Sequence, residues 1–131
     1  QGIRHMAFGD LFLEDVRAYR ERQLAGTGIT PLFPLWGSKT DELAGEMMAA
    51  GLRARISTLD PRKLPATLGG HEFDAALLAA LPAGVDPCGE NGEFHTLAYD
   101  GPMFSRPLGI RVGETVLRDG FVFTDLLPIE D

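Results

Sequence analysis

The spacing of apolar side chains changes several times along the first eighty residues. Apolar positions three and four apart are typical of a helix with one buried face, and strict alternation is typical of a strand. Apolar runs bounded by glycine or proline indicate buried extended segments. On these criteria we expect, in order, a buried strand in 1–8, a helix over 13–24, an extended segment over 29–36, a helix over 39–50, a strand over 52–58 and a helix over 71–81.

The last forty residues follow a different pattern, in which short strands are joined by tight turns. A strand is expected over 93–99, and three short strands follow around 108–112, 115–118 and 121–125. Gly113-Glu114 and Asp119-Gly120 are expected to join these strands, and Asp-Gly is a strong hairpin signal. Helices and strands that alternate, followed by a run of strands, indicate an α/β chain that gives way to an α+β part.

Composition narrows the classes of protein that this pattern fits. The chain has 131 residues, 44% hydrophobic and 24% charged, as in a folded protein with a core. We expect no membrane span and no secretory signal, because no apolar run reaches roughly 18 residues and no basic start precedes an apolar segment. A single cysteine cannot form an internal disulfide, which fits a cytoplasmic location.

Charge argues against one class of partner. The net charge is −7, and a nucleic-acid-binding surface needs clustered Lys and Arg to neutralise phosphates. The densest basic group, Arg17, Arg20 and Arg22, alternates with acids and is expected to be a solvated helix face.

The first candidate site is Gly9-Asp10, where the first strand gives way to the first helix. Open α/β sheets bind ligands at the carboxyl ends of their strands. Asp10, Glu14 and Asp15 could therefore gather there to hold Mg²⁺ or to orient a polar substrate. The alternative is that Asp10 is a loop or capping residue and that the other two acids only complement the helix dipole.

The second candidate site is the stretch DPCGENGEFHT over 86–96. Its Asn91-Gly92 pair is typical of a turn that needs positive φ. Alternation beyond the turn predicts Glu93 and His95 on one strand face, roughly 6–7 Å apart, where an acid and an imidazole can share one substrate. Glu90, in the loop, can reach the same place.

Other kinds of chemistry find less support. Cys88 with His95 suggests a thiol nucleophile, but no third group that would orient them is evident, and a cysteine can equally be a small buried apolar residue. The three histidines lack zinc-ligand spacing, so no metal-binding residue is predicted from them. Neither the common phosphate-binding motifs nor the nucleophile-elbow motif occurs.

Four strings, in the same order, resemble one family over nearly the whole chain. They are FGDLFLEDVRAYRE, PLFPLWG, DPCGENGEFHTLAYDGPMF and GETVLRDGFVFTDLL, and they resemble the diphthine–ammonia ligases. That family belongs to the PP-loop ATP pyrophosphatases, in the adenine nucleotide alpha-hydrolase-like superfamily. Its SGGKDS-type ATP-binding loop does not occur here, so the chain resembles the C-terminal portion. Asn91 and His95 depart from the archaeal and eukaryotic pattern, and the chain resembles the bacterial-type branch.

The resemblance implies a fold and a division into domains. Residues 1–37 are expected to be the end of a Rossmann-like parallel-sheet domain that binds ATP through a PP-loop. Residues 38–131 are expected to form a smaller α+β C-terminal domain with β-hairpins that binds the substrate. The residues that would face ATP or its Mg²⁺ are Gly9, Asp10, Glu14 and Asp15.

The resemblance also implies an activity. In the complete protein, ATP would activate a carboxylate of a small molecule or a protein as an acyl-adenylate, and ammonia or an amine would displace AMP. The expected catalytic residues are Glu90, Glu93 and His95, and Asn91, Gly92 and Thr96 are expected to shape the substrate-binding turn and strand.

We expect this portion alone to be inactive, with ATP and Mg²⁺ bound mainly by the part that the chain lacks. Two questions stay open from the sequence. The first is whether the protein is a ligase or a non-catalytic, nucleotide-responsive binding protein of the same fold. The second is whether it forms a homodimer.

Overall fold

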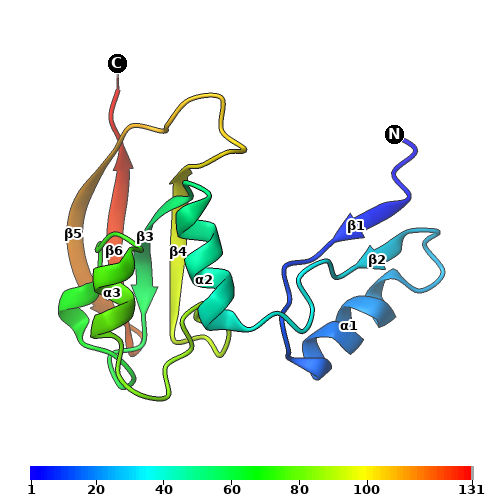
Figure 1. The fold of residues 1–131 in the computed structure, drawn as a ribbon, viewed down its shortest axis with the longest axis horizontal. Helices are drawn as coiled ribbons and strands as arrows, with labels where there is room; N and C mark the ends of the chain where they lie inside the picture. Colours follow the sequence, from blue (N-terminus) through cyan, green and yellow to red (C-terminus); the bar gives the residue numbers. More distant parts are fainter. Residues whose placement is uncertain (131) are drawn as a thin grey trace. The chain divides into compact units, whose positions relative to one another are not determined.

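The computed structural model describes residues 1–130, which divide into two compact units with the boundary between Thr40 and Asp41. The first unit is a β-α-β arrangement. In it β1 (His5–Ala7) and β2 (Thr30–Leu32) pair in parallel, and α1 (Glu14–Leu24) connects them (Figure 1). Parallel strands need such a crossover, because a tight turn can only join antiparallel strands.

The first strand is not buried, so this expectation was wrong. Ile3 is 59% exposed and Met6 is 43% exposed, and α1 contributes no buried residue. Within residues 1–40, Leu11 is the one buried hydrophobic side chain. Two short strands and one helix are too few elements to cover both faces of a sheet, so apolar residues here remain in contact with solvent.

The second unit is a four-stranded antiparallel sheet with two helices on one face (Figure 1). The strand order is β4-β3-β6-β5. The elements are α2 (Thr40–Ala49), β3 (Arg53–Leu59), the 3₁₀ turn η1 (Ala66–Leu68), α3 (Ala75–Ala80), β4 (Phe94–Asp100), β5 (Ile110–Arg118) and β6 (Phe121–Pro128). The predicted fold class, α/β followed by an α+β part with a hairpin, is confirmed.

The core lies between the two helices and the sheet. It is formed by Ala44, Ala54, Ile56, Leu59, Leu64, Phe73, Leu77, Phe94 and Val122. Successive side chains of a strand point to opposite faces. The neighbours of three core residues, namely Thr58, His95 and Phe123, therefore lie on the other side of the sheet, which we call the helix-free face. Thr58 pairs with both His95 and Phe123 across the strands.

Strands β5 and β6 form one long hairpin. Its turn is Asp119-Gly120, as predicted, with φ of 52° and 82°. The two strands expected at 108–112 and 115–118 are a single strand, because Gly113-Glu114 forms a bulge instead of a turn. Among the described residues β5 pairs only with β6, so its outer edge is open.

Residues 71–73 pair with β3, where we expected the start of a helix, and Gly70 before them is in a turn with φ of 79°. Ile56 N donates to His71 O at 2.9 Å, and Phe73 N donates to Ala54 O at 2.8 Å. Helix α3 therefore begins only at Ala75, and the Asp74 side chain caps it by accepting a hydrogen bond from the amide of Leu77. Pairing with β3 satisfies the backbone of 70–73, so helical spacing of its apolar residues does not decide its conformation.

Candidate functional site

The loop before β4 is organised by a buried carboxylate. Glu93 is only 2% exposed. Its Oε1 accepts a hydrogen bond from Asn91 N at 2.8 Å, and its Oε2 accepts one from Asp86 N. A carboxylate that accepts backbone N–H groups forms strong, charge-assisted hydrogen bonds. Glu93 therefore connects the two ends of the loop 86–91.

A second carboxylate fixes the middle of the same loop. Asp86 Oδ2 accepts hydrogen bonds from Cys88 N at 3.0 Å and from Glu90 N at 3.1 Å. Gly89 has φ of 65°, and a Cβ there would lie 2.6 Å from Phe94 O. Glycine is thus required at 89 both for the backbone conformation and for the close approach to β4. The loop is a tight turn with little freedom.

Alternation predicted that Glu93 and His95 share one strand face, but in the structure they do not. Strand β4 begins at Phe94, and the side chain of Glu93 is directed to the amides of its own loop. His95 is exposed on the helix-free face, opposite Thr58. The two side chains line different hollows. Glu93 and Lys63 line one of about 450 Å³. His95 and Phe123 line another of about 290 Å³.

The other predicted residues of this loop lie around these two hollows. Asn91 and Gly92 form the exposed turn, and Gly92 has φ of 76°. Asn91 lines the hollow of Glu93, and Gly92 lines the hollow of His95, so the turn separates the two. Glu90 is half-buried, and Thr96 is exposed on β4, where it pairs with Ile56. The structure therefore brings Gly92 and His95 together and leaves Glu93 on the other side of the turn.

Cys88 is poorly suited to be a nucleophile. Its side chain is half-buried, and it forms no disulfide. Burial, and then the nearby charges of Asp86 and Glu90, raise the pKa of the Cys88 thiol to about 11. The thiolate is the reactive form of cysteine, so the thiol is largely unreactive near neutral pH.

The hollow beside Glu93 has two basic residues that the sequence analysis missed. Arg62 Nε and Nη2 donate to the two oxygens of the buried Asp60, each at 2.9 Å. These hydrogen bonds lower the pKa of Asp60 below its ordinary value. Lys63 Nζ donates to Asn91 O at 3.4 Å. The signal was the run Asp60-Pro61-Arg62-Lys63, where the Asp-Pro turn directs two bases toward the loop.

In the first unit, the three acids of the predicted magnesium site lie before α1 and in its first turn. Asp10 accepts a hydrogen bond from Arg20 Nε at 3.3 Å. Glu14 and Asp15 are exposed in the first turn of α1, where acids complement the helix dipole. Residues 1–130 contain no group of three or more His, Cys, Asp or Glu side chains that could hold a metal ion. Gly9, just before Asp10, is exposed.

Two arginines of α1 pack on aromatic rings that follow the strands. The guanidinium of Arg17 lies 4.4 Å from the ring centre of Phe33 and 4.8 Å from that of Trp36, and the guanidinium of Arg20 lies 4.8 Å from that of Phe8. Cation–π contacts of this kind are stabilising. The expectation of a wholly solvated basic face was therefore wrong for these two arginines, because neither charge nor spacing reveals stacking partners distant in sequence.

Comparison with known sequences adds to this geometry. Residues 39–125 match the family model of the diphthamide synthase C-terminal domain. The chain belongs to this family. The matched range contains the whole second candidate site, from Asp86 to Thr96, whereas Gly9, Asp10, Glu14 and Asp15 lie before it.

Curated relatives confirm the resemblance to the diphthine–ammonia ligases. The diphthine–ammonia ligase of Rattus norvegicus is 30% identical over 128 residues, and that of Homo sapiens is 31% identical over 127 residues. Both alignments cover 92% of this chain and 47% of the relative. The diphthine–ammonia ligase of Danio rerio is 30% identical over 124 residues, and the alignment covers 90% of this chain and 48% of the relative. The chain thus spans about half the length of the curated relatives it matches.

The described part of this family member has no membrane-crossing segment among its helices. No helix within residues 1–130 is long and apolar enough to span a bilayer.

Proposed function

We propose that the complete protein is an ATP-dependent ligase that forms an amide, and that the second unit of this chain binds its acceptor. The observation that carries the proposal is the family match over 39–125, which contains the rigid loop 86–93. The relatives bear the name diphthine–ammonia ligase. The acceptor carboxylate belongs to a small molecule or a protein.

The proposed reaction has two steps. A carboxylate oxygen attacks the α-phosphorus of ATP, which forms an acyl-adenylate and releases pyrophosphate. The nitrogen of ammonia or an amine then attacks the acyl carbon, AMP leaves with the bonding electron pair, and the nitrogen gives up a proton. We place ATP and Mg²⁺ mainly on residues outside this chain. For Mg²⁺ this fits residues 1–130, which contain no group of three or more His, Cys, Asp or Glu side chains that could hold a metal ion.

Residues of the loop 86–93 and of β4 would bind the amine, accept its proton and position these groups. His95 is exposed beside Gly92, and a neutral imidazole there can accept the proton of the attacking amine. Glu90, half-buried in the loop, would help to hold the amine. Glu93 is a positioning residue, because both of its carboxylate oxygens accept backbone hydrogen bonds. Gly92 borders the acceptor in the hollow of His95, and contacts of Asn91 and Thr96 with the acceptor stay predictions from the sequence.

The test is pyrophosphate release by the full-length protein that contains this chain. With Mg-ATP, ammonium and a panel of carboxylates, one acceptor should stimulate release, and His95→Ala should lower the rate roughly 10²–10⁴-fold while ATP binding persists. His71→Ala is the matched control, since His71 is also exposed but lies outside the hollow of His95. If ATP binds and no acceptor stimulates release, the protein is a nucleotide-responsive binding protein instead.

A further inference from the structure

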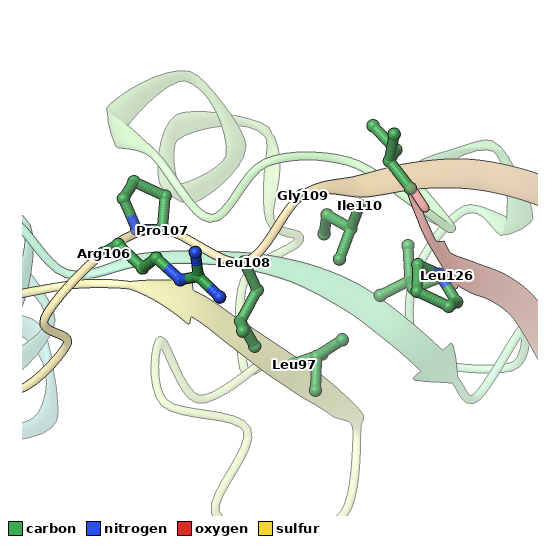
Figure 2. A pocket seen from close by; sticks show the side chains of 9 residues that line it. Leu97, Arg106, Pro107, Leu108, Gly109, Ile110 and Leu126 are labelled. Carbon is green, nitrogen blue, oxygen red and sulfur yellow. The ribbon is translucent and has the colours of Figure 1, made fainter. Parts of the chain in front are cut away.

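A third hollow lies on the sheet, apart from the hollows of Glu93 and His95. It has a volume of about 450 Å³, within the range of small-molecule sites. Figure 2 shows that side chains from β4, from the segment before β5 and from β6 meet there. Its apolar lining is Leu97, Pro107, Leu108, Ile110, Leu126, Pro128 and Ile129.

The apolar side chains of this hollow are unusually accessible. Leu97 is 39% exposed, Leu108 is 51% exposed and Ile129 is 53% exposed. The side chains of Leu97 and Leu108 point toward one another (Figure 2). Single exposed leucines are common, but several from separate segments that line one concave site indicate a surface that a ligand covers.

The hollow is held open by backbone hydrogen bonds. Leu108 N donates to Tyr99 O at 2.8 Å, which attaches the segment before β5 to β4. Ile129 N donates to Gly109 O at 2.9 Å, which attaches the end of β6 to the same segment. Both walls are therefore fixed before any ligand arrives, and a preformed site loses less conformational entropy on binding.

One cation stands beside this apolar surface. Arg106 lines the hollow, and Figure 2 shows its guanidinium next to Leu108. Within residues 1–130, Arg106 forms neither an ion pair nor a side-chain hydrogen bond. A guanidinium presents paired donors that match a carboxylate. A single cation in a chain of net charge −7 favours a monoanion over a phosphate dianion.

We infer that this hollow binds a small amphipathic carboxylate, with its hydrocarbon chain on Leu97, Leu108 and Ile110 and its carboxylate at Arg106. The site is distinct from the proposed acceptor site around His95, and the inference does not depend on the ligase activity. It concerns binding to the second unit alone.

The test is a titration of the 131-residue chain with octanoate, followed by the methyl resonances of its leucines and isoleucines. Octanoate should shift the methyl signals of Leu97, Leu108 and Ile110 and should bind about 15-fold more tightly than hexanoate, since each buried methylene contributes roughly a factor of four. Octanol, which lacks the charge, should bind more weakly than octanoate.

Two variants isolate the contribution of the guanidinium. Arg106→Gln should weaken octanoate binding by about tenfold or more and leave octanol binding unchanged. Arg111→Gln is the matched control, because it removes the same charge nearby on β5 from a residue that does not line the hollow. Equal affinity of octanoate for the wild type and Arg106→Gln would overturn the inference, as would methyl shifts confined to other residues.

Discussion

At the residue scale, the loop 86–93 shows how one side chain can determine the shape of a candidate site. Glu93 accepts hydrogen bonds from amides on both sides of the turn and is almost inaccessible to solvent. A carboxylate whose two oxygens both accept backbone hydrogen bonds holds the loop in its shape. Substitution of Glu93 should therefore affect folding as well as any activity.

Glu93→Gln should lower the free energy of unfolding by about 1–3 kcal/mol. The new amide group places an N–H where an oxygen accepted a hydrogen bond, so one buried backbone donor loses its partner. Glu46→Gln, at an exposed position of α2, makes the same chemical change and should alter stability by less than about 0.5 kcal/mol. Urea unfolding measures both, and equal effects would contradict the structural role of Glu93.

Cys88 provides a pH-dependent prediction. A pKa of about 11, against an ordinary value of 9.0, leaves roughly a hundredfold less thiolate at pH 8. A thiolate of higher pKa is also more nucleophilic, which offsets part of this loss. Exchange with an aromatic disulfide at pH 8 should therefore be about tenfold slower than for the urea-unfolded chain. The rate should still rise between pH 9 and 11, and a plateau below pH 9 would contradict the raised pKa.

What the sequence allowed us to predict at this scale was the turn, but not the direction of each side chain. Gly92 has the positive φ that the Asn91-Gly92 turn predicts, at 76°. The face of Glu93 was predicted by counting alternation from residue 93, yet β4 begins one residue later. Alternation applies only within a strand, and the amides that bind the Glu93 carboxylate can be located only once the loop is folded.

At the scale of elements, helices and strands were largely found where apolar spacing predicts them, and the exceptions have local causes. The bulge at Gly113-Glu114 resembles a turn in sequence, since glycine beside a polar residue is common to both. The segment 70–73 has apolar spacing that continues into α3, but its backbone pairs with β3. In both cases the backbone conformation is set by pairing with another strand, which local sequence does not reveal.

Gly69 determines how closely this segment approaches β6. A Cβ at Gly69 would lie 2.5 Å from Thr124 Oγ1, and Thr124 is buried and within 3.0 Å of the Thr115 hydroxyl. Gly69→Ala should therefore destabilise the protein by about 1–3 kcal/mol, because packed neighbours must move.

Gly45→Ala is the matched control for that substitution. Gly45 lies inside α2, and nothing is within 4 Å of the position of its Cβ. The same change should there stabilise the protein by roughly 0.5–1 kcal/mol, since alanine favours helix. Thermal or urea unfolding would distinguish the two signs, and destabilisation by both substitutions would contradict the packing argument.

At the scale of the whole molecule, the two units differ in how much core they contain. Ile56 and Leu59 of β3 are fully buried in the second unit, whereas Leu11 is the one buried hydrophobic residue in residues 1–40. Resistance to local opening increases with burial and with central position in a sheet.

Hydrogen exchange should reveal this difference. We expect amides of β3 to exchange at least about tenfold more slowly than those of β1 in the 131-residue chain, because β3 pairs on both edges and β1 on one. Mass spectrometry of peptides from the two strands measures the ratio. Equal protection of β1 and β3 would contradict a first unit with little core.

The open edge of β5 bears on the behaviour of concentrated samples. An unpaired strand edge can add strands from other molecules, and Val116 and Leu117 on β5 are 38% and 70% exposed. The exposed charges of Glu114 and Arg118 flank these two residues and oppose in-register stacking of identical chains, which would bring like charges together. We therefore expect Glu114 and Arg118 to oppose aggregation, and light scattering of concentrated samples should increase when both are replaced by apolar residues.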